Sequence, residues 1–266
     1  MSRLMSEIKK ELLQHPIITR LPLGVALVVA IVIFSFQMPD NMTIEYSGML
    51  PLAQQSDGFA GFVGSFVHYS CGMLVFFLAL SYLASTLLKE RQEGTASFWR
   101  SMPVSDYYAI GIKLLVSLVV IPLVSLLLLL FFDLLILLLG QWFPVGANLS
   151  LASLVIHLLH YLLTLVCFTV VFLPLASLLL LVSQLTKHPL ISLFIGYWVS
   201  SLLFKIILGT SNGISYFISL WFKLPTAIFS QQNPFMLLTQ HGVSLVIMLV
   251  ISVLLLLLTS KLRSAK

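Results

Sequence analysis

Long runs of apolar residues constrain this chain more than any other feature of its sequence. A helix needs about 20 such residues to cross the ~30 Å hydrocarbon core of a bilayer. Only 9% of the 266 residues are charged and 59% are hydrophobic, which excludes an ordinary water-soluble domain. The sequence therefore predicts an all-α membrane protein with one transmembrane domain, residues 1–266. Its six predicted spans lie near residues 21–37, 59–88, 107–139, 151–185, 190–208 and 242–260.

The basic residues are distributed unevenly between the predicted connections. If the N-terminus is cytoplasmic, twelve of the fourteen Lys and Arg lie on the cytoplasmic side, and only Lys205 and Lys223 lie outside. Cytoplasmic connections carry the excess of basic residues in membrane proteins, so the sequence predicts that both termini are cytoplasmic. The same rule accounts for the net charge of +5, and nucleic acid is not an expected partner.

Two further segments have patterns of their own. Residues 1–16 predict an amphipathic helix in the membrane surface, because apolar side chains fall on one helical face. Residues 209–241 begin with a polar, glycine-containing break and continue with an aromatic stretch that is too short to span. We expect two short re-entrant helices there, dipping into the outer leaflet before the sixth span, because backbone groups in lipid must stay paired.

Residues 89–105 form a polar interruption between the second and third predicted spans. Four of the first five residues are charged. Gly94 and Thr95 supply a helix break and an N-cap, Trp99 belongs to a one-sided apolar edge, and Pro103 disfavours helical geometry at the residue before it. These signals predict a short surface helix of about two turns. On physical grounds alone, a solvated loop whose charges merely anchor two spans explains the segment equally well.

The residues of this segment resemble the signature of the ABC-2 type permease family. The chain has Glu93-Gly94-Thr95, then Met102-Pro103-Val104-Ser105, and then Gly111-Ile112-Lys113-Leu114 at the start of the next helix. Met102 stands where Leu is common in the family. The resemblance also includes the N-terminal helix, the six spans and the broken helix before the last span, so it extends over nearly the whole chain.

The resemblance implies the transmembrane subunit of an ATP-driven exporter in a bacterial cytoplasmic (inner) membrane. Two permease subunits, identical or different, would enclose the translocation path, and a dimer of separate ABC ATPase subunits would bind ATP and Mg²⁺. The chain has no phosphate loop, H-E-x-x-H or G-x-S-x-G motif, so we expect neither an enzyme nor a cofactor in it. Aromatic, weakly charged spans favour a hydrophobic or amphiphilic cargo, such as a drug, peptide or lipid.

In this interpretation, residues 89–105 contain the coupling helix, which is seated against the ATPase. The turn with Lys187 and His188 would make a second, smaller contact, although an ordinary positive-inside turn explains it as well. The mixed charges and aromatic side chains of the coupling segment suit a protein partner better than lipid. The predicted contact residues are Glu90, Arg91, Glu93, Gly94, Thr95, Phe98, Trp99 and Arg100.

Within the predicted spans, Asp133 is the one acidic residue, and it needs a partner or water because a charge at mid-membrane costs about 2.5–3.5 kcal/mol. Counting from the outer ends places His157, His160 and Lys205 at a comparable depth, where pairing across three helices is expected. These four polar residues have two interpretations: they line an export path, or they form a structural ion pair within the bundle. We expect no metal site, because the two histidines lack a third ligand. An ATPase-independent channel, scaffold or intramembrane enzyme that uses Asp133, His157 and His160 is the alternative function.

Overall fold

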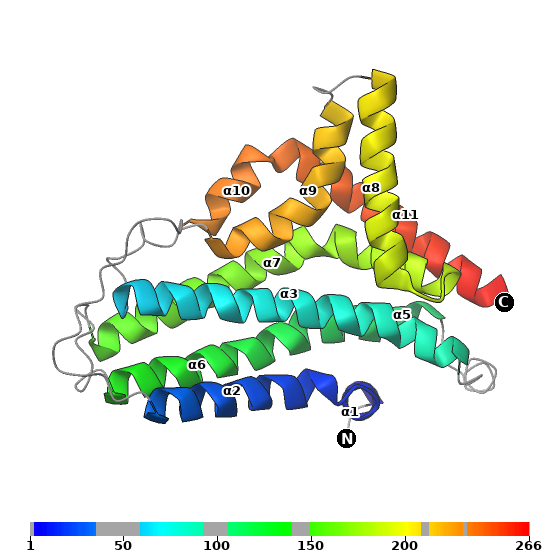
Figure 1. Ribbon diagram of the computed structural model, residues 1–266. Coiled ribbons are helices and arrows are strands. Elements are labelled where there is room, and N and C mark those ends of the chain that lie inside the picture. Colours follow the sequence, from blue (N-terminus) through cyan, green and yellow to red (C-terminus); the bar gives the residue numbers. More distant parts are fainter. Residues whose placement is uncertain are drawn as a thin grey trace.

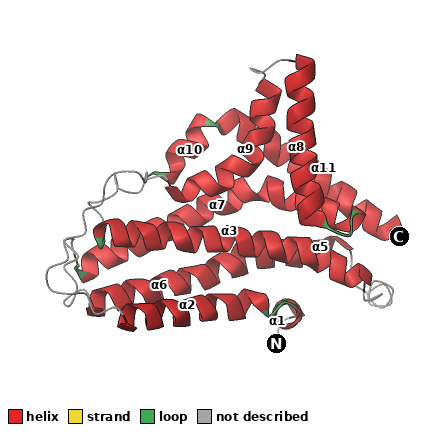
Figure 2. Cartoon of the chain, viewed as in Figure 1, coloured by secondary structure: helices red, strands yellow, loops and turns green. Residues whose placement is uncertain are grey.

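The computed structural model describes residues 3–35, 59–92, 106–139, 149–208, 213–230 and 233–265. Within these ranges the chain is helical apart from short turns, which confirms the all-α prediction (Figure 2). A π-helical turn, η2 (Val116–Val120), joins two helices, and a 3₁₀ turn, η3 (Ile228–Ser230), follows another. The α-helices are α1 (Arg3–Gln14), α2 (Ile17–Ser35), α3 (Gly61–Gln92), α5 (Asp106–Leu115), α6 (Ile121–Leu139), α7 (Leu151–Leu185), α8 (Pro189–Leu208), α9 (Gly213–Ala227), α10 (Pro234–Gln240) and α11 (Gly242–Ala265).

Four or five of the described segments are long and apolar enough to cross a membrane. Four do so alone: Val63–Glu90, Tyr107–Leu138, Leu151–Leu185 and Gly242–Arg263. Helices α1 and α2 qualify only as a pair, which is bent by 64° at a break containing Pro16. The apolar part of α8, Pro189–Leu203, is shorter than a full span. The total of six spans, with α8 as the fifth, and the surface position of α1 therefore stay predictions.

Helices α2, α6, α3 and α7 lie roughly side by side, and α8 stands across them (Figure 1). Helix α7 packs extensively against α3 and α11, and α3 also packs along α6. In the centre, the ring of Phe168 stacks on Phe172 and lies 5.1 Å from the ring of Phe229 in η3. A Cβ atom at Gly72 would come within 2.2 Å of the Phe229 ring, so only glycine allows this close approach of α3 and η3. The core is thus formed mainly by α3 and α7, with η3 closing one side.

Helices α5, η2 and α6 form one continuous helical segment that runs antiparallel to α3 (Figure 1). The N–H of Ile121 donates to the carbonyl of Val116, five residues earlier, which widens the helix at η2. Pro122 follows directly and has no N–H to donate. A π turn in a helix often marks a functional position and here separates the two halves of the segment.

The connections differ from the sequence-based expectation in one respect. Helix α3 continues to Gln92, beyond the end at residue 88 that hydrophobicity predicted, because residues 89–92 are good helix formers with no breaker. The predicted coupling helix falls on residues 93–105, which lie outside the described residues. Between α8 and α11 the chain forms α9, η3 and α10, and their re-entrant position in a membrane stays a prediction.

Candidate functional site

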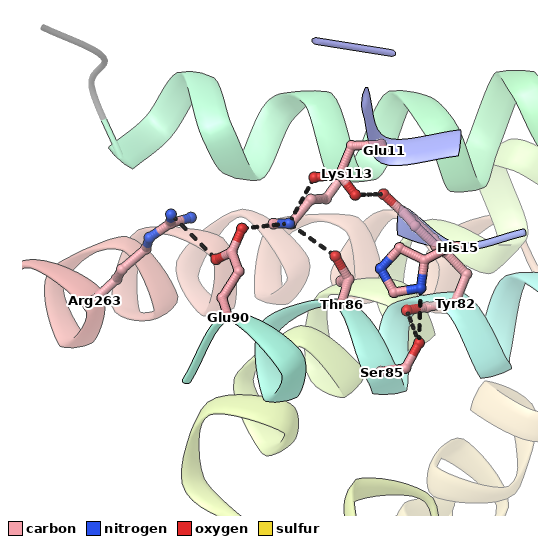
Figure 3. A network of polar contacts seen from close by, with 8 residues as sticks. All are labelled: Glu11, His15, Tyr82, Ser85, Thr86, Glu90, Lys113 and Arg263. Atoms are coloured by element: carbon pink, nitrogen blue, oxygen red, sulfur yellow. Dashed lines mark hydrogen bonds and ion pairs between the residues drawn. The ribbon is translucent and has the colours of Figure 1, made fainter. Parts of the chain in front are cut away.

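Lys113 of α5 lies at the centre of a buried ionic network (Figure 3). Its side chain is only 2% exposed. The Nζ atom lies 2.9 Å from Glu11 Oε1 and 2.8 Å from Glu90 Oε1, and it donates a hydrogen bond of 2.8 Å to Thr86 Oγ1. An ammonium has three donors, so these three contacts satisfy it completely.

Each carboxylate of this network has a second donor. Tyr82 donates its hydroxyl to Glu11 Oε2 at 3.0 Å, and Arg263 Nη2 lies 3.2 Å from Glu90 Oε2. Two cations and two anions thus alternate, and their charges cancel. Buried charges persist when they are paired and hydrogen-bonded in this way. We call the set in Figure 3 the Lys113 network; it comprises Glu11, His15, Tyr82, Ser85, Thr86, Glu90, Lys113 and Arg263.

Two groups near the end of α1 have perturbed acidities. Burial opposes the charge on Glu11, but the Lys113 ammonium and the hydrogen bonds from Lys113 and Tyr82 outweigh it, so the Glu11 pKa lies below its ordinary value. Burial, together with the charge of Lys89, lowers the pKa of His15 to about 4. His15 is therefore neutral at pH 7, and its ring packs edge-on against Tyr82 at 5.1 Å. The Lys113 network accordingly holds an ionised Glu11 beside a neutral imidazole.

The Lys113 network joins four helices that are far apart in sequence. It connects α1 and the end of α11 to the last turns of α3 and to α5. Glu90 precedes the 93–105 segment and Lys113 follows it, so the two sides of this segment are fastened together. Figure 3 shows Glu90 between Lys113 and Arg263, with both carboxylate oxygens paired.

Of the eight predicted ATPase contacts, Glu90 is the one whose side chain lies within the described part of the chain. Its carboxylate belongs to the Lys113 network. The Arg91 side chain and the other six contacts lie outside the described residues. Lys187 and His188 are exposed in the turn between α7 and α8. Ser183 in the last turn of α7 donates to the carbonyl of Ala84, so this turn lies at the same end of the bundle as the Lys113 network.

A second polar site lies at the other end of α3, α6 and α7. Asp133 of α6 is fully buried, and its Oδ2 atom lies 2.9 Å from Nδ1 of His157. The ring of His68 in α3 lies between those of His157 and His160, at centroid distances of 5.5 and 5.3 Å. The structure thus brings together three of the four predicted intramembrane residues. The Lys205 side chain lies outside the part that the structure describes.

We call His68, Asp133, His157 and His160 the histidine cluster. Tyr161 packs edge-on against His68 at 4.9 Å and hydrogen-bonds with Ser125, which donates to the carbonyl of Cys71. Within this cluster, Asp133 Oδ1 and His68 Nε2 are buried without a hydrogen-bond partner among the described residues. No three metal-ligating side chains of the described ranges are arranged to hold a metal ion.

Sequence reasoning missed His68. It is a single histidine in a long apolar run, with no partner at helical spacing. Two features of the sequence pointed to it: Asp133 needs polar neighbours within the membrane, and His68 is a further polar ring within a predicted span. Only the packing of α3 against α7 shows that His68 faces His157 and His160.

The two polar sites lie at opposite ends of the same two helical segments. On α3, 22 residues separate His68 from Glu90, and on the α5–α6 segment 20 residues separate Lys113 from Asp133. At ~1.5 Å per residue, each separation is about 30 Å, close to the thickness of a bilayer's hydrocarbon core. The two sites are therefore spaced like the two faces of a membrane.

Comparisons with protein-family models, curated proteins and solved structures gave no significant match.

Proposed function

We propose that the chain is the transmembrane subunit of an ATP-driven ABC-2 type exporter. In this proposal, the coupling segment, residues 89–105, contacts a separate ATPase subunit in the cytoplasm, and two permease subunits enclose the path. The resemblance of residues 90–105 and 111–115 to the family signature supports it. The bundle of long apolar helices is compatible with it.

The position of Lys113 is the observation that carries the proposal. Lys113 bonds to Glu90 before the 93–105 segment and to Glu11 of α1, so the helices on either side of the segment are fastened to each other and to α1. A segment that transmits movement must be attached to elements that move with it as a body. The Lys113 network meets this requirement, because displacement of the segment would act on α1, α3, α5 and α11 together.

ATP binding and hydrolysis belong to the partner in this proposal. Dimerisation of the ATPase on ATP moves the two coupling segments, and the helices attached to them change the side on which the path opens. In this proposal the cargo is hydrophobic or amphiphilic, since the predicted spans are rich in aromatic residues and carry few charges. The chain itself converts closure of the ATPase into a change of access.

Purification of the tagged chain from its native membrane in mild detergent tests the proposal. We expect an ABC ATPase in stoichiometric amount, identified by mass spectrometry, together with ATP turnover by the purified complex. Mass spectrometry of small molecules in the same sample would indicate the cargo. The untagged strain is the control for nonspecific capture. A folded chain that purifies without any nucleotide-binding subunit would contradict the proposal and favour a channel or scaffold.

A further inference from the structure

Helix α1 has two unlike faces, one turned toward the bundle and one exposed. Met5, Lys9 and Leu13 follow one another at intervals of four residues, so they form a row along one face of the helix. All three are exposed, and Leu13 is 73% exposed. The opposite face carries Glu11, which is buried in the Lys113 network. The row of Met5, Lys9 and Leu13 therefore faces away from the bundle.

The exposed charged residues that the structure describes around the end of α1 are all positive. Lys9 and Arg20 are exposed on either side of the 64° bend between α1 and α2. Lys89 of α3 is also exposed, and its Nζ donates a hydrogen bond of 3.3 Å to the last carbonyl of α1. The acids of α1 and α2 are Glu7, which is half-buried, and Glu11, which belongs to the Lys113 network. The surface at the bend is therefore cationic.

The exposed face of α1 continues into an apolar surface on α2. Ile17 and Leu21 are exposed close to Arg20. Helices α1 and α2 lie at one edge of the bundle (Figure 1) and together qualify as a broken membrane span. A cationic rim next to an apolar surface is typical of side chains at the boundary between lipid headgroups and acyl chains. The exposed aliphatic side chains farther along α2 are Leu23, Leu27, Val28 and Ile31.

We propose that the exposed face of α1 and the α1–α2 bend bind anionic phospholipid headgroups at the membrane surface. Lys9, Arg20 and Lys89 attract the negatively charged headgroup, and Met5 and Leu13 contact the adjacent acyl chains. A water-soluble protein fits this surface less well, because the exposed aliphatic side chains continue along α2 into the span. The binding needs no ATPase, so the inference is independent of the proposed exporter function.

Titration of the purified full-length chain with dioctanoyl phosphatidylglycerol in neutral detergent tests this inference. Dioctanoyl phosphatidylcholine is the lipid without net charge, and microscale thermophoresis at a fixed detergent concentration gives the apparent Kd of each. We expect tighter binding of phosphatidylglycerol, which weakens as the salt concentration rises. In the Lys9→Gln, Arg20→Gln double variant we expect the Kd of phosphatidylglycerol to rise about 25-fold, since each cation near a membrane surface contributes about five-fold. The Kd of phosphatidylcholine should not change.

The matched control is the Lys187→Gln, Lys223→Gln double variant, which removes two exposed cations away from α1 and should keep the Kd of phosphatidylglycerol. An equal Kd for the two lipids, or unchanged binding by the folded Lys9→Gln, Arg20→Gln variant, would overturn the inference. The same loss in the control would show an effect of net charge alone and would also overturn it.

Two further arms keep the test decisive. Inorganic phosphate should bind far more weakly than phosphatidylglycerol, and an equal Kd would show a site for a free anion instead of a lipid surface. If the double variant does not fold, the single variants Lys9→Gln and Arg20→Gln decide. Each should raise the Kd of phosphatidylglycerol about five-fold, and no change in either would contradict the proposed surface.

Discussion

The Lys113 network and the histidine cluster bury charge at opposite ends of the same helices, but in different ways. In the Lys113 network, two cations and two carboxylates are paired, and Lys113 has three partners of its own. In the histidine cluster, the carboxylate of Asp133 has one imidazole partner, and two buried polar atoms lack hydrogen bonds among the described residues.

This difference indicates that the two sites hold their helices together with different rigidity. A network of paired, hydrogen-bonded charges holds the helices that carry it in a fixed relation. A cluster in which one carboxylate has a single imidazole partner has fewer contacts that hold its helices together. We therefore expect the Lys113 end to act as a rigid base and the histidine end to be the adjustable one.

Replacing Lys113 by Met should have the largest effect on stability. The substitution leaves Glu11 and Glu90 buried without their shared cation, and breaking a buried ion pair on one side costs about 3–5 kcal/mol. Thermal unfolding in detergent, followed by size-exclusion chromatography, should show a large fall in Tm. Lys223→Met, at an exposed position, is the matched control. Equal melting of the two variants would show that the Lys113 network does not stabilise the bundle.

Glu90→Gln should have a smaller effect at the same site. The amide still accepts one hydrogen bond, but it removes the charge that Lys113 and Arg263 share. A loss of about 1–3 kcal/mol is expected for such a weakened charged contact. Combining Glu90→Gln with Lys113→Met in a double-mutant cycle measures the coupling. Strictly additive losses would contradict a direct interaction between the two side chains.

Acidification should destabilise the Lys113 end in two stages. The His15 pKa is lowered from 6.5 to about 4, so its contribution is complete above pH 6.5 and is lost as the pH falls through about 4. At pH 5 the free energy of unfolding has already fallen by about 1–2 kcal/mol through His15. The Glu11 pKa is also lowered, and its contribution disappears at still lower pH, below the ordinary Glu value. Measurements of Tm against pH should show a weaker fall between pH 6.5 and 5 in His15→Gln. An identical slope would refute the role of His15.

Asp133→Asn should have the smallest effect on stability, in contrast to Lys113→Met. The amide oxygen of Asn can still accept a hydrogen bond from His157. Asp133→Asn also removes a buried charge, whereas Lys113→Met leaves two buried carboxylates without their cation. We expect Tm to change by the equivalent of about 1 kcal/mol or less at pH 7. The control is His157→Leu, which leaves the carboxylate without its partner and should cost more. A larger loss in Asp133→Asn than in Lys113→Met would reverse the proposed roles of the two sites.

Local sequence patterns predicted most of the helices but few of the contacts between their charged side chains. The predicted span at 151–185 coincides with α7, because its apolar run is bounded by clear start and stop signals. Asp133 and His157 could be brought together by counting depth along two adjacent spans. The sequence placed Lys113 among the cytoplasmic basic residues and in the family signature, but it did not indicate the ion pair with Glu11, which lies 102 positions away. Hydrophobicity also ended the second span before Glu90, although α3 continues past it.

The central claim is that an ATPase binds residues 93–105 and moves the helices through the Lys113 network. The most direct measurement compares the ATPase that co-purifies with the unmodified chain and with a Glu93→Arg, Trp99→Ala double variant. Trp198→Ala, which truncates an exposed tryptophan of α8, is the matched control. We predict that the double variant loses the ATPase while keeping its Tm, and that the control retains it. Full retention of the ATPase by a folded double variant would contradict the account.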